Sequence, residues 1–167
     1  MLDEAKELEQ KARAVREEAA AKNPKDPLIH LMSIAQEIND RFRAFTTSKN
    51  ADANVVEWVK QLQAELHPRL AEAMDMIRSM DGAKINLRLI EVLRGTESRL
   101  DATNKLPFTT EAVALALAKQ PANASMIAAK ADLLSARDDY QAASDSLQQL
   151  LDLPMPPTSL EIGRAHV

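Results

Sequence analysis

The chain has 167 residues, enough for one ordinary domain with a buried core, and its 21 basic and 25 acidic residues give a net charge of −4. The absence of cysteine excludes a disulfide scaffold, a thiolate metal site and a cysteine nucleophile. Hydrophobic residues make up 46% of the chain, yet aromatics make up only 3% and there are three glycines. So many helix formers with so few breakers, and no period-two runs of β-branched or aromatic residues, predict an all-α protein.

The charges exclude further classes of partner. Basic residues are interspersed with acidic ones and form no stripe with aromatics, so we expect no nucleic-acid partner. No stretch approaches about 18 uninterrupted apolar residues, so we expect no membrane span in the part seen. The start of the chain is acidic and helix-forming, unlike a signal peptide. Together with the lack of cysteine this favours a cytoplasmic location, with the question of whether Met1 is the native start left open.

The first predicted helix, 3–22, is highly charged and has a thin, alanine-rich apolar stripe, so it needs a close neighbour. The sequence N-P-K-D-P at 23–27 ends this helix. Asp26 is placed to N-cap a second helix, and Pro27 then occupies the first helical position, where its missing N–H costs nothing.

The second predicted helix, 27–46, has a thick apolar stripe on one face. Two of the three phenylalanines, Phe42 and Phe45, belong to this stripe. We therefore expect both of them in the core.

The third predicted helix, 54–80, is the longest, and its apolar residues recur at steps of three and four, almost as in a coiled coil. Asn54 is the expected N-cap. Pro68 predicts a kink or a break, because proline lacks the N–H donor and clashes with the preceding turn. Gly82 is the expected left-handed C′ residue. Trp58 is offset from the seam, and two interpretations stay open: a half-buried packing residue or an interface anchor.

A fourth helix is predicted over 83–102, with Gly95 weakening its middle by roughly 1 kcal/mol relative to alanine. A short, very apolar helix follows at 111–120, capped by Thr109 or Thr110. This helix has almost no polar face, so it should be buried on most sides.

Two more short helices are predicted over 123–136 and 139–153, and Asp138 with Gln141 has the spacing of a capping box for the second of them. Across this pair, large and small apolar residues follow a fixed spacing. Six positions carry the pattern: Ile127, Ala131, Leu134, Tyr140, Ala143 and Leu147.

The segment 121–157 resembles the tetratricopeptide repeat (TPR), a 34-residue helix–turn–helix unit that stacks into solenoids. Small residues let the two helices approach closely, and the aromatic at Tyr140 fills the gap between neighbouring units. Lys130 and Leu150 depart from the family pattern, and the closing proline is displaced by one residue. The alternative is a generic αα-hairpin with an alanine-rich seam.

One repeat length earlier, the pattern continues in degenerate form. Leu93, Leu100 and Val113 fall at repeat positions, whereas Glu97 and Thr109 stand where small residues are expected. Residues 28–105 do not keep the 34-residue period.

The resemblance implies that a peptide or protein partner binds the concave surface lined by the first helix of each pair. The residues that map to this surface are Ser125, Ala128, Asp132 and Ser135.

No catalytic, cofactor-binding or metal-binding residue is predicted. His30 and His67 lack the spacing of a ligand pair, and Glu65, Glu72 and Asp75 follow the helical spacing of a solvated face. There is no glycine-rich phosphate loop. We therefore expect a non-catalytic chain without a cofactor.

The last six residues, I-G-R-A-H-V at 162–167, match the translation of a common short-read sequencing adapter, ATC GGA AGA GCA CAC GTC. This match predicts that 162–167 are non-native and that the natural protein continues beyond about residue 160. Any chemistry encoded downstream is then absent from this chain.

Together these features predict an α-solenoid-like array of antiparallel helical hairpins: an irregular helical region at 1–105, a TPR-like hairpin region at 106–157 and a disordered tail at 158–167. The predicted function is a protein–protein interaction scaffold. Two alternatives stay open. One is a structural helical bundle or coiled coil that assembles as a homo-oligomer through exposed helical faces. The other is the substrate-selecting arm of an enzyme whose catalytic domain is missing downstream.

Overall fold

The computed structural model describes residues 2–47, 54–101 and 103–154, and every regular element in this part of the chain is helical. The elements in chain order are α1 (Leu2–Lys22), α2 (Pro27–Thr47), α3 (Val55–Ser79), the 3₁₀-helix η1 (Gly82–Lys84), α4 (Leu87–Leu100), α5 (Pro107–Lys119), α6 (Ala124–Ser135) and α7 (Tyr140–Leu151). The all-α prediction is confirmed for these residues. The predicted tail, 158–167, lies outside them.

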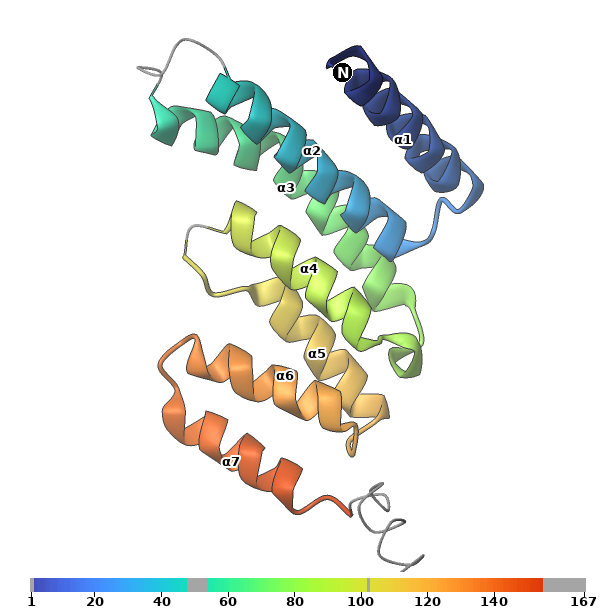
Figure 1. The fold of residues 1–167 in the computed structure, drawn as a ribbon. Helices are drawn as coiled ribbons and strands as arrows, with labels where there is room; N and C mark the ends of the chain where they lie inside the picture. Colours follow the sequence, from blue (N-terminus) through green and yellow to red (C-terminus); the bar gives the residue numbers. More distant parts are fainter. Residues whose placement is uncertain (1, 48–53, 102, 155–167) are drawn as a thin grey trace, which may run out of the picture.

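The helices follow one another along an elongated array, with α1 at one end and α7 at the other (Figure 1). Consecutive helices pack as antiparallel neighbours, and α2 also contacts α4 while α3 also contacts α5. Three hairpins, α2–α3, α4–α5 and α6–α7, are therefore stacked in chain order, and α1 lies on α2. The predicted boundary at 105/106 falls between α4 and α5, which pack on each other.

The main core lies between α2, α3, α4 and α5, with α6 closing one end. Its largest fully buried side chains include Leu31, Ile34, Leu66, Leu70, Met74, Ile77, Leu93, Val113, Met126 and Ile127. At the two ends the burial is thinner: α7 buries only Ala143 and Ser146. A terminal helix has a neighbour on one side, so its other side stays in contact with solvent.

Two predicted helix starts are confirmed by their caps. The Asp26 carboxylate accepts a hydrogen bond from the Leu28 N–H at 2.9 Å, and the Asn54 side chain accepts one from the Val56 N–H at 3.2 Å. Both caps are local interactions between residues two apart, which is why the sequence alone predicts them.

Of the kink or break expected at Pro68, the break is wrong, since α3 continues across this residue from Val55 to Ser79. Proline inside a helix costs about 3 kcal/mol. The neighbouring Leu66 and Leu70 are fully buried, and burial of one leucine side chain contributes about 1.5–3 kcal/mol. Core packing on either side therefore outweighs the lost hydrogen bond.

The predicted role of Gly82 is also wrong, because no glycine among the described residues has a positive φ. α3 ends at Met80 in an extended conformation, and the Asp81 carboxylate then caps η1 by accepting from the Ala83 N–H at 3.0 Å. The fourth helix consequently begins at Leu87, later than predicted, with Asn86 as its N-cap. Gly82 is needed for a different reason, a close approach to α5.

The expected core position of Phe42 is wrong as well. Phe42 is exposed near the end of α2, while Phe45 and Trp58 are half-buried there. The Phe45 and Trp58 rings stack with centroids 4.7 Å apart, and the Phe42 ring lies 6.3 Å from Trp58. The Phe42 end of the apolar stripe therefore stays in contact with solvent.

Candidate partner-binding surface

The α6–α7 hairpin is built by two side-chain caps and one sharp turn. Asn123 caps α6 by accepting from the Met126 N–H, and Asp139 caps α7 by accepting from the Ala142 N–H, each at 3.2 Å. The prediction that Asp138 caps α7 is wrong by one residue, because Asp138 has a φ of 61° and forms the turn. Aspartate tolerates this left-handed conformation better than most residues.

The two helices of this hairpin approach each other through small residues. Ala131 and Ala143 are both buried, and Ile127 is fully buried beside them. Leu134 is half-buried. Alanine at the crossing lets the backbones come close, which is the physical basis of the spacing seen in the sequence.

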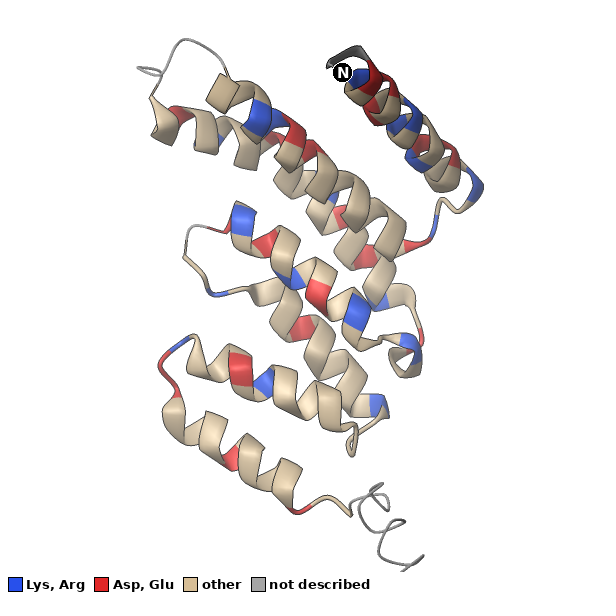
Figure 2. Ribbon diagram, viewed as in Figure 1, with Lys and Arg blue, Asp and Glu red and all other residues tan. Residues whose placement is uncertain are grey.

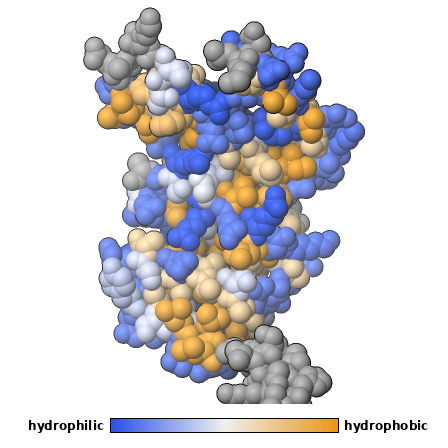
Figure 3. Space-filling model, in the orientation of Figure 1, coloured by the Kyte–Doolittle hydropathy of each residue, from blue (hydrophilic) through white to orange (hydrophobic). Residues whose placement is uncertain are grey.

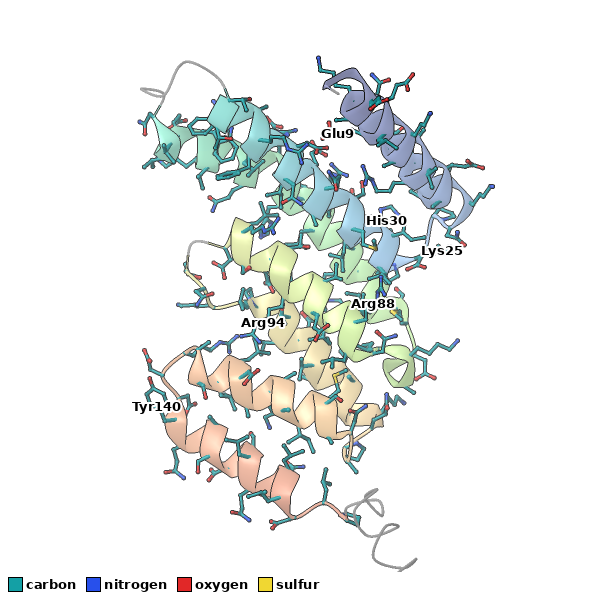
Figure 4. All side chains as sticks on the ribbon, viewed as in Figure 1. Glu9, Lys25, His30, Arg88, Arg94 and Tyr140 are labelled. Atoms are coloured by element: carbon teal, nitrogen blue, oxygen red, sulfur yellow. The ribbon has the colours of Figure 1, made fainter. Side chains whose placement is uncertain are left out.

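The other two positions of the repeat pattern differ from the expectation. Tyr140 and Leu147 lie on the outer side of α7 and are exposed, and the Tyr140 hydroxyl donates to the Asp138 carboxylate at 2.8 Å. Within the described residues Tyr140 fills no gap between units, because α7 packs on α6 alone. Figure 4 shows its side chain pointing outward at the edge of the array.

The residues mapped to the partner-binding surface lie together on α6. Ser125, Asp132 and Ser135 are exposed and Ala128 is half-buried. The structure therefore brings all four to one accessible helix face.

Arg94 of α4 extends this surface across the neighbouring helix and was not predicted from the sequence. Its guanidinium lies 3.7 Å from the Asp132 carboxylate, and Figure 4 shows it between α4 and α6. Arg94 stands 34 residues before Ala128, so the repeat spacing itself could have identified it. The surface formed by these residues of α4 and α6, called here the α4–α6 face, carries mixed charge (Figure 2).

A separate group of charged side chains joins α2 to α3. The Glu37 carboxylate accepts from Arg41 at 2.6 Å and also binds Arg69, and Arg41 binds Glu65 as well. Partial burial raises the pKa of Glu37, but hydrogen bonds from Arg69 and Arg41 outweigh this effect and hold it below its usual value. The predicted solvated carboxylate Glu65 is thus engaged in an ion pair.

Glu37→Gln is expected to lower the free energy of unfolding by up to about 1 kcal/mol at neutral pH. Because the folded pKa of Glu37 is lowered, its contribution is present above the unfolded value of about 4.3 and is lost as the pH falls through the folded value. The difference between wild type and variant should therefore shrink below about pH 4.3. Urea unfolding at neutral and acidic pH measures it, with the exposed Glu72→Gln as control. A difference independent of pH would contradict the expectation.

The two described histidines and Asp75 each contact a different partner. His30 contacts the Pro24 carbonyl oxygen at 3.2 Å, the His67 ring lies beside Phe108, and Asp75 is bound to Arg78. The part of the chain that the structure describes contains no group of three or more His, Cys, Asp or Glu residues able to hold a metal ion. None of its helices is long and apolar enough to cross a bilayer.

Known proteins add no assignment: no family model matches the chain, and no curated protein and no solved structure matches it either. The fold and surface define an all-α protein of stacked helical hairpins. Its function has to be argued from that surface.

Proposed function

We propose that the chain is a helical-repeat interaction module that binds a peptide or protein partner on the α4–α6 face, and that the described residues take no part in catalysis. The observation that carries this proposal is the stacking of three antiparallel hairpins in chain order, with α2 contacting α4 and α3 contacting α5. Such an array resembles a TPR-like solenoid, in which the first helices of successive pairs line one surface.

The side chains on this surface favour binding of an extended or helical peptide over binding of a small molecule. Serines at 125 and 135 can donate and accept hydrogen bonds, and Arg94 and Asp132 offer one charge of each sign. The Arg94–Asp132 pair is loose and solvent-exposed, so a partner can replace either member at little cost. A polar surface with few apolar anchors indicates modest affinity and a partner of mixed charge.

The proposal predicts that Ser125→Arg/Ser135→Arg weakens binding of peptides selected against the wild-type chain by at least about tenfold, or 1.4 kcal/mol. Both positions are exposed, so two arginines block the face without disturbing the core. A random peptide library displayed on phage supplies the peptides, and fluorescence anisotropy measures their Kd.

The matched control is Gln61→Arg/Ala64→Arg, which adds the same charge at two exposed positions of α3. This control should bind the selected peptides like wild type. Equal losses in the two double variants would show that added charge alone weakens binding. A library that yields no binding peptide would count against the interaction module itself.

A further inference from the structure

The outer side of α7 presents three exposed apolar side chains and one serine in a single row. Tyr140, Leu147 and Leu151 are 66%, 47% and 75% exposed, and together with Ser144 they recur at steps of four, three and four residues. This spacing places all four on one side of the helix. Figure 3 shows hydrophobic residues gathered at this end of the array, over α6 and α7. We call Tyr140, Ser144, Leu147 and Leu151 the α7 stripe.

The residues one repeat length earlier show what such a stripe does when it is covered. Leu106 and Val113, the counterparts of Tyr140 and Leu147, are only 3% and 2% exposed. Val113 and Leu117, the counterpart of Leu151, line a groove with Leu133 and Leu134 of α6. Val113 and Leu117 of α5 therefore face the next helix, α6. On α7 the same positions have no helix above them among the described residues.

Acidic residues predominate around the α7 stripe, and the nearest basic residue in sequence is Arg137, in the turn before α7. Residues 138–152 contain four aspartates and neither lysine nor arginine. A second row, formed by Gln141, Asp145, Gln148 and Asp152, runs beside the stripe, because each of its residues directly follows a stripe residue. In Figure 2 the red of acidic residues is the charge colour seen on α7. A helix that docks here gains electrostatic attraction if it is basic and is repelled if it is acidic.

α6, the helix that covers α5, faces it with apolar and basic side chains, as expected of a helix that docks on such a stripe. The groove between α5 and α6 is bordered by Lys130 and Arg137 as well as by leucines, and the Arg137 guanidinium binds the Thr110 hydroxyl of α5. An apolar stripe flanked by basic residues thus already occupies the equivalent position one unit earlier.

We infer that the α7 stripe is a docking surface for a basic amphipathic helix of another protein, seated where α6 sits on α5. This inference rests on the proposed interaction function but uses a different surface from the α4–α6 face. A second copy of the chain is a poor occupant, because two α7 helices would bring eight aspartates together.

The test uses a fluorescein-labelled peptide of about 18 residues, helical by design, with leucines at steps of four and three and lysines at the flanking positions. A second peptide has glutamates in place of the lysines. Anisotropy titration of the intact chain should give a Kd at least about tenfold lower for the lysine peptide, and the preference should weaken in high salt.

Two double variants locate the site. Leu147→Ser/Leu151→Ser should weaken binding of the lysine peptide at least about tenfold. Leu8→Ser/Val15→Ser removes two aliphatic side chains of similar exposure, 67% and 65%, from α1 at the far end of the array and should leave binding unchanged. Asp145→Lys/Asp152→Lys should reverse the preference between the two peptides. All these positions are exposed, and circular dichroism verifies that helicity is retained.

Several results would overturn the inference: equal affinity for the two peptides, equal loss in the α1 control, or dimers of the wild type that Leu147→Ser/Leu151→Ser converts to monomers. Binding that appears only after residues 155–167 are deleted would show that the chain covers its own stripe, and would also overturn it. If the lysine peptide fails while the phage-selected peptides still bind the α4–α6 face, the α7 inference fails alone. The reverse result contradicts only the proposed function.

Discussion

Glu97→Ala is expected to lower the free energy of unfolding by about 3–5 kcal/mol, the largest effect of any single polar substitution in the chain. Glu97 is 2% exposed on α4, and its carboxylate accepts three hydrogen bonds from the start of α5. The donors are the Phe108 N–H at 2.8 Å, the Thr109 N–H at 2.8 Å and the Thr109 hydroxyl at 2.6 Å. Without the carboxylate these three donors, two of them on the buried Thr109, lose their partner, and a cavity remains.

The α5 helix depends on Glu97 because it has no cap of its own. Its N-cap position is Leu106, in a left-handed conformation with a φ of 47°, and no side-chain cap hydrogen bond is made there. Glu97 therefore supplies from α4 the cap that the local sequence lacks, and its negative charge also interacts favourably with the positive end of the α5 dipole.

Urea denaturation of wild type, Glu97→Ala and Glu97→Gln measures the effect. Glutamine keeps one acceptor oxygen and loses the charge, so we expect about half the loss seen with alanine. The control is Glu91→Ala, an exposed glutamate on the same helix, for which we expect a change within about 0.5 kcal/mol. Similar losses at positions 91 and 97 would contradict the capping role.

A double-mutant cycle separates the hydrogen bonds from the cavity. Thr109→Ala removes one donor, and Glu97→Ala/Thr109→Ala creates the small pair found one repeat later as Ala131 and Ala143. We expect the double variant to be less destabilised than the sum of the single variants by about 1–3 kcal/mol, since the two side chains are in direct contact. Additive losses would mean that the two residues act independently.

Glu97 and Thr109 also show why the 34-residue pattern could be followed only in part from the sequence. Glu97 and Thr109 each violate the small-residue rule when considered singly, and the structure shows that they do so together. A carboxylate and a hydroxyl that bind each other replace two alanines at the helix crossing. Sequence spacing predicts which positions face each other. Only the packed structure shows that two residues departing from the pattern are hydrogen-bonded to each other.

Two helix starts were predictable because their signal is local. Asp26 with Pro27 marks the start of α2, and Asn54 marks the start of α3. The start of α5 was wrong because its cap comes from α4, ten residues and more away in sequence. A cap supplied by another helix leaves no signature in the residues beside the helix it caps.

Burial was harder to predict than helicity. Phe42 and Leu147 both belong to apolar stripes, yet both are exposed, because burial depends on whether a further helix lies over that part of the stripe. Leu106 and Tyr140 occupy equivalent positions with opposite burial for the same reason. The candidate surface on α6 was located by spacing alone, whereas Arg94 came from a neighbouring helix that the resemblance matched only in degenerate form.

Gly82→Ala is expected to lower the free energy of unfolding by about 1–3 kcal/mol, although the backbone there has an ordinary conformation. A Cβ atom at this position would lie 2.5 Å from the Leu115 carbonyl oxygen and 2.9 Å from the Lys119 Cγ. The Lys119 side chain can move away, but the carbonyl belongs to the α5 backbone. The Gln120 amide also donates to the Ala83 carbonyl at 2.8 Å, which holds η1 against the end of α5. Relief of the clash therefore requires the two elements to separate.

The matched substitution is Gly95→Ala, at an exposed position inside α4 where the new Cβ meets nothing within 4 Å beyond its chain neighbours and the surrounding turns of its own helix backbone. Alanine there restricts the unfolded chain and favours the helix, so we expect stabilisation by about 0.5–1 kcal/mol. Thermal and urea unfolding of the two variants compares the same chemical change in opposite surroundings. Stabilisation by both would mean that η1 moves freely on α5 and that the close approach does not fix the α3–α4 connection. Opposite signs would show that Gly82 is required by packing between elements, since both substitutions add the same methyl group.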